Sequence, residues 1–305
     1  MKPTIPLHGL TTAPHTPFHP DGTFHPEAVA LQAGHFQRHG VESVFIGGTT
    51  GECHSLTLVE RLALTDRWME TSQNGGPRVV VHAGSNCLAD ARALAAHAEE
   101  RGAAAIAAFA PSYFRPASLE ALVAWCQEVS AAAPATPFYF YDFPAMTGVS
   151  FPMPDFLAIG HRRIPMLAGL KFTNPDLAAY QRCLRTEGGP WDLPFGVDEH
   201  LLGALALGAQ GAVGSGFNFA APLFRRLLDA FNAGDLETAR QEQFRAVRLA
   251  GLLTSFGYMA AAKTVMEFLS IPVGPPRLPH LPLSADRKSA LRRGLEEMGF
   301  FEWTQ

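Results

Sequence analysis

Short apolar or β-branched runs alternate with longer helix-like stretches along most of this chain. We expect strands at eight of these runs, which cover residues 9–13, 43–46, 79–83, 105–110, 138–141, 167–172, 194–197 and 211–213. Helical patterns fill the segments between them, among them residues 26–39, 58–73, 88–101, 119–132, 176–185 and 199–207. Strands that alternate with helices pair in parallel through helical crossovers, and eight such units close a barrel. The sequence therefore predicts an α/β protein with the (β/α)₈ TIM-barrel fold.

The main alternative is an open, doubly wound sheet. That fold usually carries a glycine-rich loop after its first strand, whereas here residues 14–20 read Pro-His-Thr-Pro-Phe-His-Pro. After Ala220 the strands stop, and helical patterns cover residues 222–270 and a last segment from about Ser284 to Met298. We therefore expect a barrel over residues 1–221 and a helical C-terminal extension over residues 222–305, packed together as one functional domain.

Composition excludes several classes of protein. A content of 47% hydrophobic and 17% charged residues is typical of a packed globular protein. The net charge of −4 offers no basic surface for nucleic acid, and the longest strictly apolar run, residues 103–111, is too short to span a bilayer. Because no basic-then-apolar signal opens the chain, we predict a cytoplasmic protein. The four cysteines form no Cys-x-x-Cys pair, so neither a zinc knuckle nor a disulfide framework is indicated.

Lysine is scarce in this sequence, which makes its placement informative. Of 24 basic residues only four are lysines, namely Lys2, Lys171, Lys263 and Lys288. Lys171 lies inside the apolar run of residues 166–173, where a charge is costly. One interpretation is a lysine that reaches a buried carboxylate. The other, which we favour, is an amine with a lowered pKa that attacks a carbonyl and forms a Schiff base.

Tyr141 ends the strand expected next to that of Lys171. Adjacent barrel strands lie about 5 Å apart, so its hydroxyl can reach the amine or a bound substrate and move a proton. It could equally be a core tyrosine of the aromatic run 138–141. Tyr139 has the same parity along the strand, and only the position at the rim favours Tyr141.

Residues 47–52 read Gly-Gly-Thr-Thr-Gly-Glu and follow the second expected strand. They expose backbone N–H groups and the hydroxyls of Thr49 and Thr50 with little side-chain bulk, a pattern suited to a carboxylate or phosphate. We call residues 47–52 the cradle. The alternative is an ordinary turn with capping threonines.

Other polar groups give weaker signals. Asp198 and Glu199 follow the seventh expected strand, where one could cap a helix while the other binds a ligand. A glycosidase-type acid pair is disfavoured, because the two acids of such a pair flank the scissile bond from different strands. The pairs His15 with His19 and His35 with His39 have metal-like spacing but lack the further carboxylate of a zincin motif, so we expect no metal. Cys53 has no obvious activating base.

Taken together, these motifs resemble one family, the pyruvate-dependent class I aldolases typified by dihydrodipicolinate synthase and N-acetylneuraminate lyase. The matching pieces are residues 48–52, 141–145, 169–173 and 214–215, and the resemblance runs from about Leu7 to the last helix. Within the family the sequence is similar to the animal-type N-acetylneuraminate lyase branch, through residues 137–141, 146–149, 195–199, 208–215 and 271–279. Dihydrodipicolinate synthases are expected to carry an arginine where this chain has Met146, which argues against that branch.

The resemblance implies a role for each candidate residue. Lys171 would form the imine with the 2-keto carbon of an open-chain sialic acid, and Tyr141 would act with the substrate carboxylate in proton transfer at the 4-hydroxyl. Cleavage would release N-acetylmannosamine and pyruvate, with no metal or organic cofactor. Thr49 and Thr50 would hold the carboxylate. The residues expected to face the polyhydroxy and N-acetyl part are Thr173, Gly196, Asp198, Glu199 and Ser215.

Two rival functions stay open at this point. One is another 2-keto-acid aldolase or dehydratase on the same scaffold, for example one for 2-keto-3-deoxy sugar acids. The other is a non-catalytic keto-acid or sugar binding protein, which the presence of both Lys171 and Tyr141 disfavours. Asp142 stands where the family commonly has asparagine, and its effect on Tyr141 is not evident from sequence. By resemblance we expect a homotetramer whose ligand is a small molecule.

Overall fold

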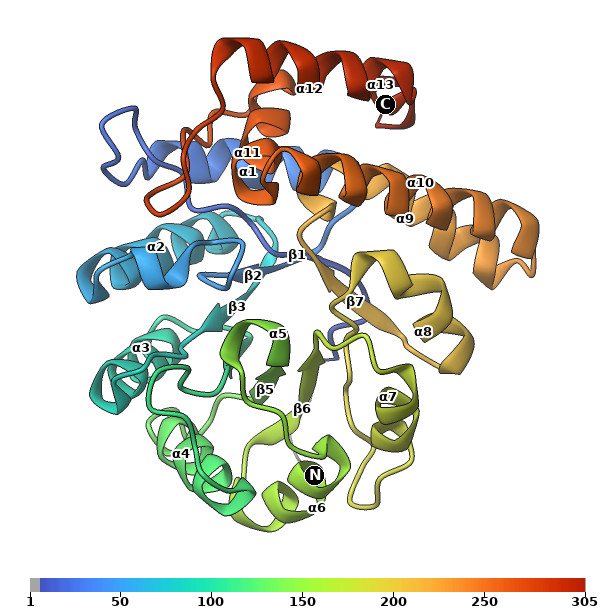
Figure 1. The fold of residues 1–305 in the computed structure, drawn as a ribbon. Coiled ribbons are helices and arrows are strands. Elements are labelled where there is room, and N and C mark those ends of the chain that lie inside the picture. The colour runs from blue at the N-terminus through green and yellow to red at the C-terminus, as the bar shows by residue number, and fades with distance from the viewer. Residues whose placement is uncertain (1–5, 305) are drawn as a thin grey trace.

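Parallel strands form a barrel with helices around its outside (Figure 1). The computed structural model describes residues 6–304. Within them the seven regular strands are β1 Gly9–Thr12, β2 Ser43–Ile46, β3 Arg78–His82, β4 Ala105–Ala108, β5 Phe138–Asp142, β6 Leu167–Phe172 and β7 Gly211–Gly214. Their order in the sheet is β6-β5-β4-β3-β2-β1-β7, and all the pairs are parallel. All seven agree with the predicted strands to within two residues.

The eighth predicted strand, residues 194–197, is present only as single bridges. Phe195 bridges Phe172 of β6 on one side and Ala212 of β7 on the other, which closes the barrel. Its N–H donates to Gly211 O at 2.9 Å, and its carbonyl accepts from Val213 N at 2.8 Å. Pro194 has no N–H to extend this ladder, so no regular strand forms. The predicted closed barrel is confirmed, with a shortened eighth position.

Helices cover the outside of the barrel between the strands. They are α1 Glu27–Arg38, α2 Leu58–Gln73, α3 Leu88–Glu100, α4 Leu119–Ala131, α6 Met153–Arg163, α7 Leu177–Leu184, α8 Leu201–Leu207 and α9 Phe217–Asn232. The short helix α5 Pro144–Thr147 lies instead inside this ring, at the end of β5 (Figure 1). The start of α2 is fixed by a capping box in which Thr57 and Glu60 bond reciprocally. The sequence prediction names no helix at α6, whose first turn contains proline. Proline is tolerated there because a backbone N–H in the first turn of a helix would have no partner within the helix.

The C-terminal part of the chain is helical, as predicted. It contains α10 Leu236–Ser255, α11 Tyr258–Phe268, α12 Ala285–Glu297 and α13 Phe300–Trp303, which lie together beside α1 and α9 (Figure 1). The expected boundary between residues 221 and 222 falls inside α9, next to a break in helical geometry at Ala220 (φ −134°, ψ 25°) and to Pro222. No helix within residues 6–304 combines the length and the apolar character needed to cross a membrane.

The core has two parts. A large apolar cluster fills the space between the strands and the outer helices. A smaller cluster lies inside the barrel and is built from inward-facing residues such as Phe45, Val80, Ala107 and Tyr141. Small side chains at several interior positions leave space near the carboxyl ends of the strands, where barrel enzymes place their active sites.

Candidate active site

Lys171 lies inside the barrel on β6, directly opposite Tyr141 of β5. Its side chain is buried, and its Nζ lies 3.9 Å from the ring centre of Phe45 and 4.0 Å from that of Tyr141. Within residues 6–304, no carboxylate lies within ion-pair distance of this amine, so the alternative of a lysine reaching a buried carboxylate finds no support. Burial lowers the pKa of Lys171 to about 7, although the charge of Asp198 partly opposes this. At neutral pH a large share of the amine is therefore unprotonated and nucleophilic.

The structure separates the two tyrosines that parity alone could not. Tyr139 donates its hydroxyl proton to Asp192 Oδ2 at 2.6 Å, deeper in the barrel. The hydroxyl oxygen of Tyr141 instead lies 3.3 Å from Thr49 Oγ1, at the rim. Burial raises the pKa of Tyr141, so the phenol is protonated at neutral pH. Tyr141 is thus the tyrosine placed beside Lys171 and the cradle.

The cradle forms a tight turn after β2 that only small residues fit. Gly47 has a φ of +62°, and a Cβ on Gly48 would lie 2.8 Å from the ring of Phe45. The turn closes with a hydrogen bond from Glu52 N to Thr49 O at 3.0 Å. Within residues 6–304, the N–H groups of Thr49 and Thr50 donate no hydrogen bond to a backbone carbonyl outside the regular helices and strands. Backbone N–H groups exposed in this way are the kind of donor that binds a small anion.

Polar residues that follow β6, β7 and the irregular eighth position, residues 194–197, also contact one another. Asp198 Oδ2 accepts a hydrogen bond from Gly216 N at 2.8 Å, and burial raises the pKa of its carboxyl to about 7. A Cβ on Gly196 would lie 2.0 Å from Thr173 Oγ1, so only glycine lets this hydroxyl approach. Ser215 Oγ lies 2.5 Å from the hydroxyl of Tyr258, which the sequence analysis did not single out.

Glu199 is not brought into this group. Its side chain is exposed and lines an outer groove together with residues of α7, α8 and α10, such as Leu177 and Arg240. Asp198 and Glu199 begin a short 3₁₀ turn, Asp198–His200, rather than continuing a strand, so they take different environments. The charge of Asp198 acts on Lys171, whereas Glu199 lines the outer groove, so the structure supports Asp198 as a site residue more directly than Glu199.

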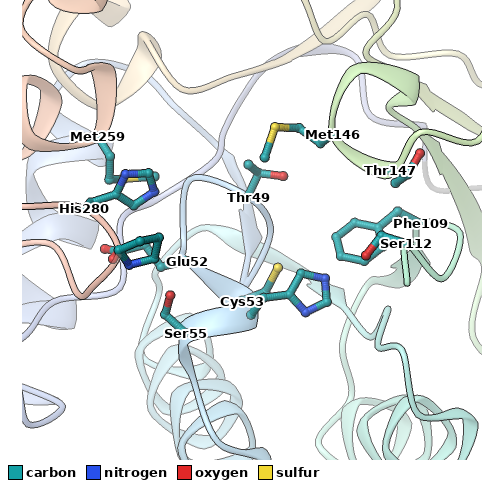
Figure 2. A pocket seen from close by; sticks show the side chains of 12 residues that line it. Thr49, Glu52, Cys53, Ser55, Phe109, Ser112, Met146, Thr147, Met259 and His280 are labelled. Atoms are coloured by element: carbon teal, nitrogen blue, oxygen red, sulfur yellow. The ribbon is translucent and has the colours of Figure 1, made fainter. Parts of the chain in front are cut away.

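A pocket of about 210 Å³ opens above the cradle (Figure 2). Thr49 belongs to its wall and also contacts Tyr141, so the pocket leads toward the buried amine. Met146 lines it and is 61% exposed, which places an apolar side chain where a synthase is expected to have arginine. Met259 and His280 come from the C-terminal extension. The extension therefore contributes to the site itself, which the sequence did not reveal.

Sequence reasoning also missed His82, at the end of β3. Its Nδ1 donates to Gly47 O at 2.8 Å, since a carbonyl can only accept. Its ring packs on Phe109 with centroids 4.3 Å apart and meets Tyr141 edge-on at 5.8 Å. Burial lowers its pKa well below the usual range, so the ring is neutral. The sequence signal for His82 is a polar residue at the end of an otherwise apolar strand, β3 Arg78–His82.

A second buried lysine was missed as well. The Nζ of Lys263 lies 2.7 Å from Glu52 Oε1, and each side chain is 1% exposed. Burial lowers the pKa of Lys263 to about 8, against the opposing effect of Glu52. Lys288 forms an ion pair with Glu267 at 2.6 Å near the surface, and Lys2 lies outside the described residues. Of the three described lysines, only Lys171 has no ion pair.

The histidine pairs singled out in the sequence have other surroundings. His35 Nε2 contacts Asn218 O at 2.9 Å. Within residues 6–304 one group of potential metal ligands occurs, His19 with His25 and Glu27. The rings of His19 and His25 stack with centroids 4.1 Å apart, and His25 Nε2 lies 3.9 Å from Glu27 Oε2. The thiol of Cys53 is buried, which raises its pKa and disfavours a nucleophilic thiolate.

Asp142 lies on the opposite face of β5 from Tyr141, since successive strand residues alternate. Its carboxylate accepts from Asn174 Nδ2 at 3.2 Å, and burial raises its pKa to about 6. Asp142 is thus part of the packing between β5 and the segment after β6.

Known proteins with similar sequences match this chain over nearly their whole length. The dihydrodipicolinate synthetase family matches residues 6–298. N-acetylneuraminate lyase of Danio rerio is 37% identical over 289 residues, which cover 93% of this chain and 94% of the relative. The human N-acetylneuraminate lyase is 34% identical, with 99% and 96% covered. The structure of N-acetylneuraminate lyase from Aliivibrio salmonicida superimposes with a TM-score of 0.94 at 40% identity, covering 97% and 98% of the two chains.

Proposed function

The chain belongs to the dihydrodipicolinate synthetase family, and from that premise we propose that it cleaves N-acetylneuraminate to pyruvate and N-acetylmannosamine. The resemblance read from the sequence motifs is confirmed, as is the enzyme class, a lyase of the aldolase type. The single observation that carries the proposed chemistry is the buried amine of Lys171, which lies beside Tyr141 and has no ion pair within residues 6–304.

The proposed reaction begins with the neutral amine of Lys171. It attacks the 2-keto carbon of the open-chain sugar acid, and loss of water leaves a protonated imine. As the bond between C3 and C4 breaks, its electron pair moves toward the imine nitrogen and gives an enamine. The enamine is protonated at C3, and hydrolysis of the resulting imine releases pyruvate. The imine is itself the electron sink, so the reaction as proposed needs no metal or organic cofactor.

Tyr141 moves the proton of the 4-hydroxyl in this proposal. Because its phenol is protonated at rest, it acts as a relay: it takes the 4-hydroxyl proton while passing its own to the substrate carboxylate. The N–H groups and hydroxyls of Thr49 and Thr50 hold that carboxylate. The residues proposed to face the sugar part are Thr173, Gly196, Asp198 and Ser215, whereas Glu199, expected there from the resemblance, lines the outer groove. The proposal also includes a homotetramer, which is expected by family resemblance, and a cytoplasmic location.

We expect borohydride to trap pyruvate on Lys171. Reduction of the imine during incubation with pyruvate should add a stable three-carbon adduct, because only Lys171 offers a largely neutral amine without an ion pair among the described lysines. Peptide mass spectrometry locates the adduct. An adduct on Lys263 or Lys288 would rule out the mechanism assigned to Lys171. The absence of any adduct would also rule it out and would leave a non-catalytic binding protein as the better interpretation.

Substrate choice is tested by pyruvate release from N-acetylneuraminate and from 2-keto-3-deoxygluconate. We expect a higher kcat/KM for N-acetylneuraminate, because Asp198 and Ser215 offer hydrogen-bonding groups beyond the reacting carbons. A higher value for 2-keto-3-deoxygluconate would replace the sialic-acid proposal with the rival aldolase.

The rate of adduct formation should rise with pH around the pKa of Lys171, which is about 7. Below that pH the amine is protonated and cannot attack, so the second-order rate constant with pyruvate falls about tenfold per pH unit. The carboxyl of Asp198 titrates in the same range, so Asp198→Asn serves as control. A midpoint of the rate profile near pH 10, typical of an exposed lysine, would contradict the assignment. Loss of the pH dependence in Asp198→Asn would contradict it as well.

A further inference from the structure

Glu52, the last residue of the cradle, lines the pocket and binds the C-terminal extension through its carboxylate. Its Oε1 pairs with Lys263 Nζ at 2.7 Å, and its Oε2 accepts from Arg277 N at 2.8 Å. Both side chains of the ion pair are 1% exposed. A buried pair repays its desolvation only when the remaining groups are also satisfied, so the full set of partners matters here.

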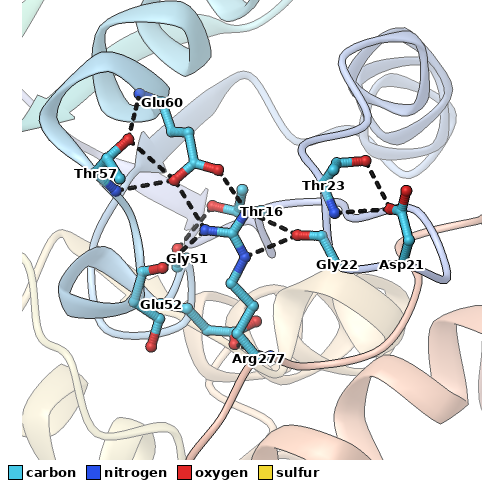
Figure 3. Close-up of polar contacts among 10 residues, drawn as sticks. Thr16, Asp21, Gly22, Thr23, Gly51, Glu52, Thr57, Glu60 and Arg277 are labelled. Atoms are coloured by element: carbon cyan, nitrogen blue, oxygen red, sulfur yellow. Dashed lines mark hydrogen bonds and ion pairs between the residues drawn. The ribbon is translucent and has the colours of Figure 1, made fainter.

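The ammonium group of Lys263 also donates hydrogen bonds to two backbone carbonyls. Its Nζ donates to Thr16 O and to Pro275 O, each at 3.0 Å. Thr16 in turn donates its hydroxyl to Gly51 O at 2.7 Å (Figure 3). Lys263 therefore holds the end of the cradle by two routes, through the carboxylate of Glu52 and through Thr16 to Gly51.

Arg277 contacts the segment that follows the cradle, which leads into α2 (Figure 3). Its guanidinium donates to Ser55 O at 2.8 Å, to Glu60 Oε2 at 2.9 Å and to Gly22 O at 2.7 Å. Glu60 also closes the capping box of α2, so the contact fixes the position of the helix that follows the cradle. The C-terminal extension thus holds both ends of the segment from Glu52 to Glu60.

The backbone of Glu52 needs such support. Its φ of 55° and ψ of 40° are left-handed, a conformation that brings the Cβ of a residue too close to the following carbonyl oxygen. Strained residues of this kind persist where the surroundings hold them. Through its hydrogen bond to Thr49 O, this residue also sets the turn that carries the N–H groups of Thr49 and Thr50.

We propose that Lys263 is a positioning residue for the substrate carboxylate: its contacts with Glu52 and Thr16 hold the cradle in the shape that binds the anion. The inference rests on the proposed function, since it assigns the cradle to the carboxylate of a 2-keto acid. The carboxylate is held in both the ground state and the transition state. Loss of Lys263 should therefore raise KM and change kcat little.

The test compares pyruvate with pyruvamide, which has the same keto carbon but no charge. For Lys263→Met, the pyruvate concentration that gives half-maximal borohydride trapping should rise at least about tenfold, the size of one charge-assisted contact, whereas that of pyruvamide should change less than about twofold. Lys288→Met makes the same change in the surface ion pair with Glu267 and should leave both values unchanged. Equal shifts for the two ligands, or no shift, would overturn the inference.

A second variant keeps the test valid if Lys263→Met does not fold, because that change leaves Glu52 buried without a partner. Glu52→Gln combined with Lys263→Met replaces the ion pair by neutral groups, which proteins often tolerate. We expect the double variant to fold and still lose preference for pyruvate over pyruvamide. Full recovery of that preference would show that Lys263 does not position the cradle. Failure of the wild-type protein to form any adduct would instead reject the proposed function.

Discussion

Lys171→Met should abolish turnover and the reducible pyruvate adduct while leaving the protein folded. The change removes the nucleophile and, with it, the imine that accepts the electron pair of the breaking bond. Removing the nucleophile of a covalent mechanism costs a factor of at least about 10⁴ in kcat. We expect no measurable pyruvate release from N-acetylneuraminate and no adduct by mass spectrometry.

The same variant has a distinct expectation for stability. Lys171 is buried without an ion pair among the described residues, so its charge is costly, and methionine has a similar length without that charge. The melting temperature of Lys171→Met should therefore equal or exceed that of the wild type. Lys288→Met is the matched control and should keep full turnover. A residual adduct in Lys171→Met would mean that another amine carries the chemistry.

Tyr141→Phe should lower kcat by about 10²–10⁴, the range for loss of a proton-transferring group, while pyruvate adduct formation stays within about tenfold of wild type. The reason is that the proposed relay acts at the 4-hydroxyl during cleavage, and pyruvate has no such hydroxyl. The phenol also contacts Thr49 Oγ1 at 3.3 Å, which explains the smaller loss in adduct formation. Stopped-flow trapping and steady-state pyruvate release separate the two effects.

Tyr139→Phe provides the matched control on the same strand. Its hydroxyl is bonded to Asp192 at 2.6 Å, away from the cradle, so the change should lower the melting temperature and spare kcat. A comparable fall in kcat for both variants would mean that the rim position does not distinguish Tyr141. Equal loss of trapping and cleavage in Tyr141→Phe would move this residue from proton relay to imine formation.

Much of the fold followed from short stretches of sequence. The alternation of apolar runs with helical patterns predicted seven strands to within two residues, because such patterns depend only on which face of each segment is buried. The exception, residues 194–197, contains a proline that interrupts pairing. The glycines of the cradle were equally readable, since a tight turn without side chains has a local signature.

The partners of individual side chains were much less predictable. Sequence parity could not choose between Tyr139 and Tyr141, and it gave no sign that Glu199 faces outward while Asp198 lies near Lys171. The contact of His82 with Gly47 O of the cradle joins residues 35 positions apart, and no local pattern shows it.

The sequence by itself determined the closed barrel, the inward amine of Lys171 and the glycine-rich cradle, because each depends on residues that are neighbours in the chain. Only the tertiary structure decided how these parts are held. Lys263 read as one more helical lysine, yet it is buried against Glu52 and donates to a carbonyl 247 residues away. Whether a charge is buried, and by what it is paired, depends on which distant segments meet, and no local pattern carries that information.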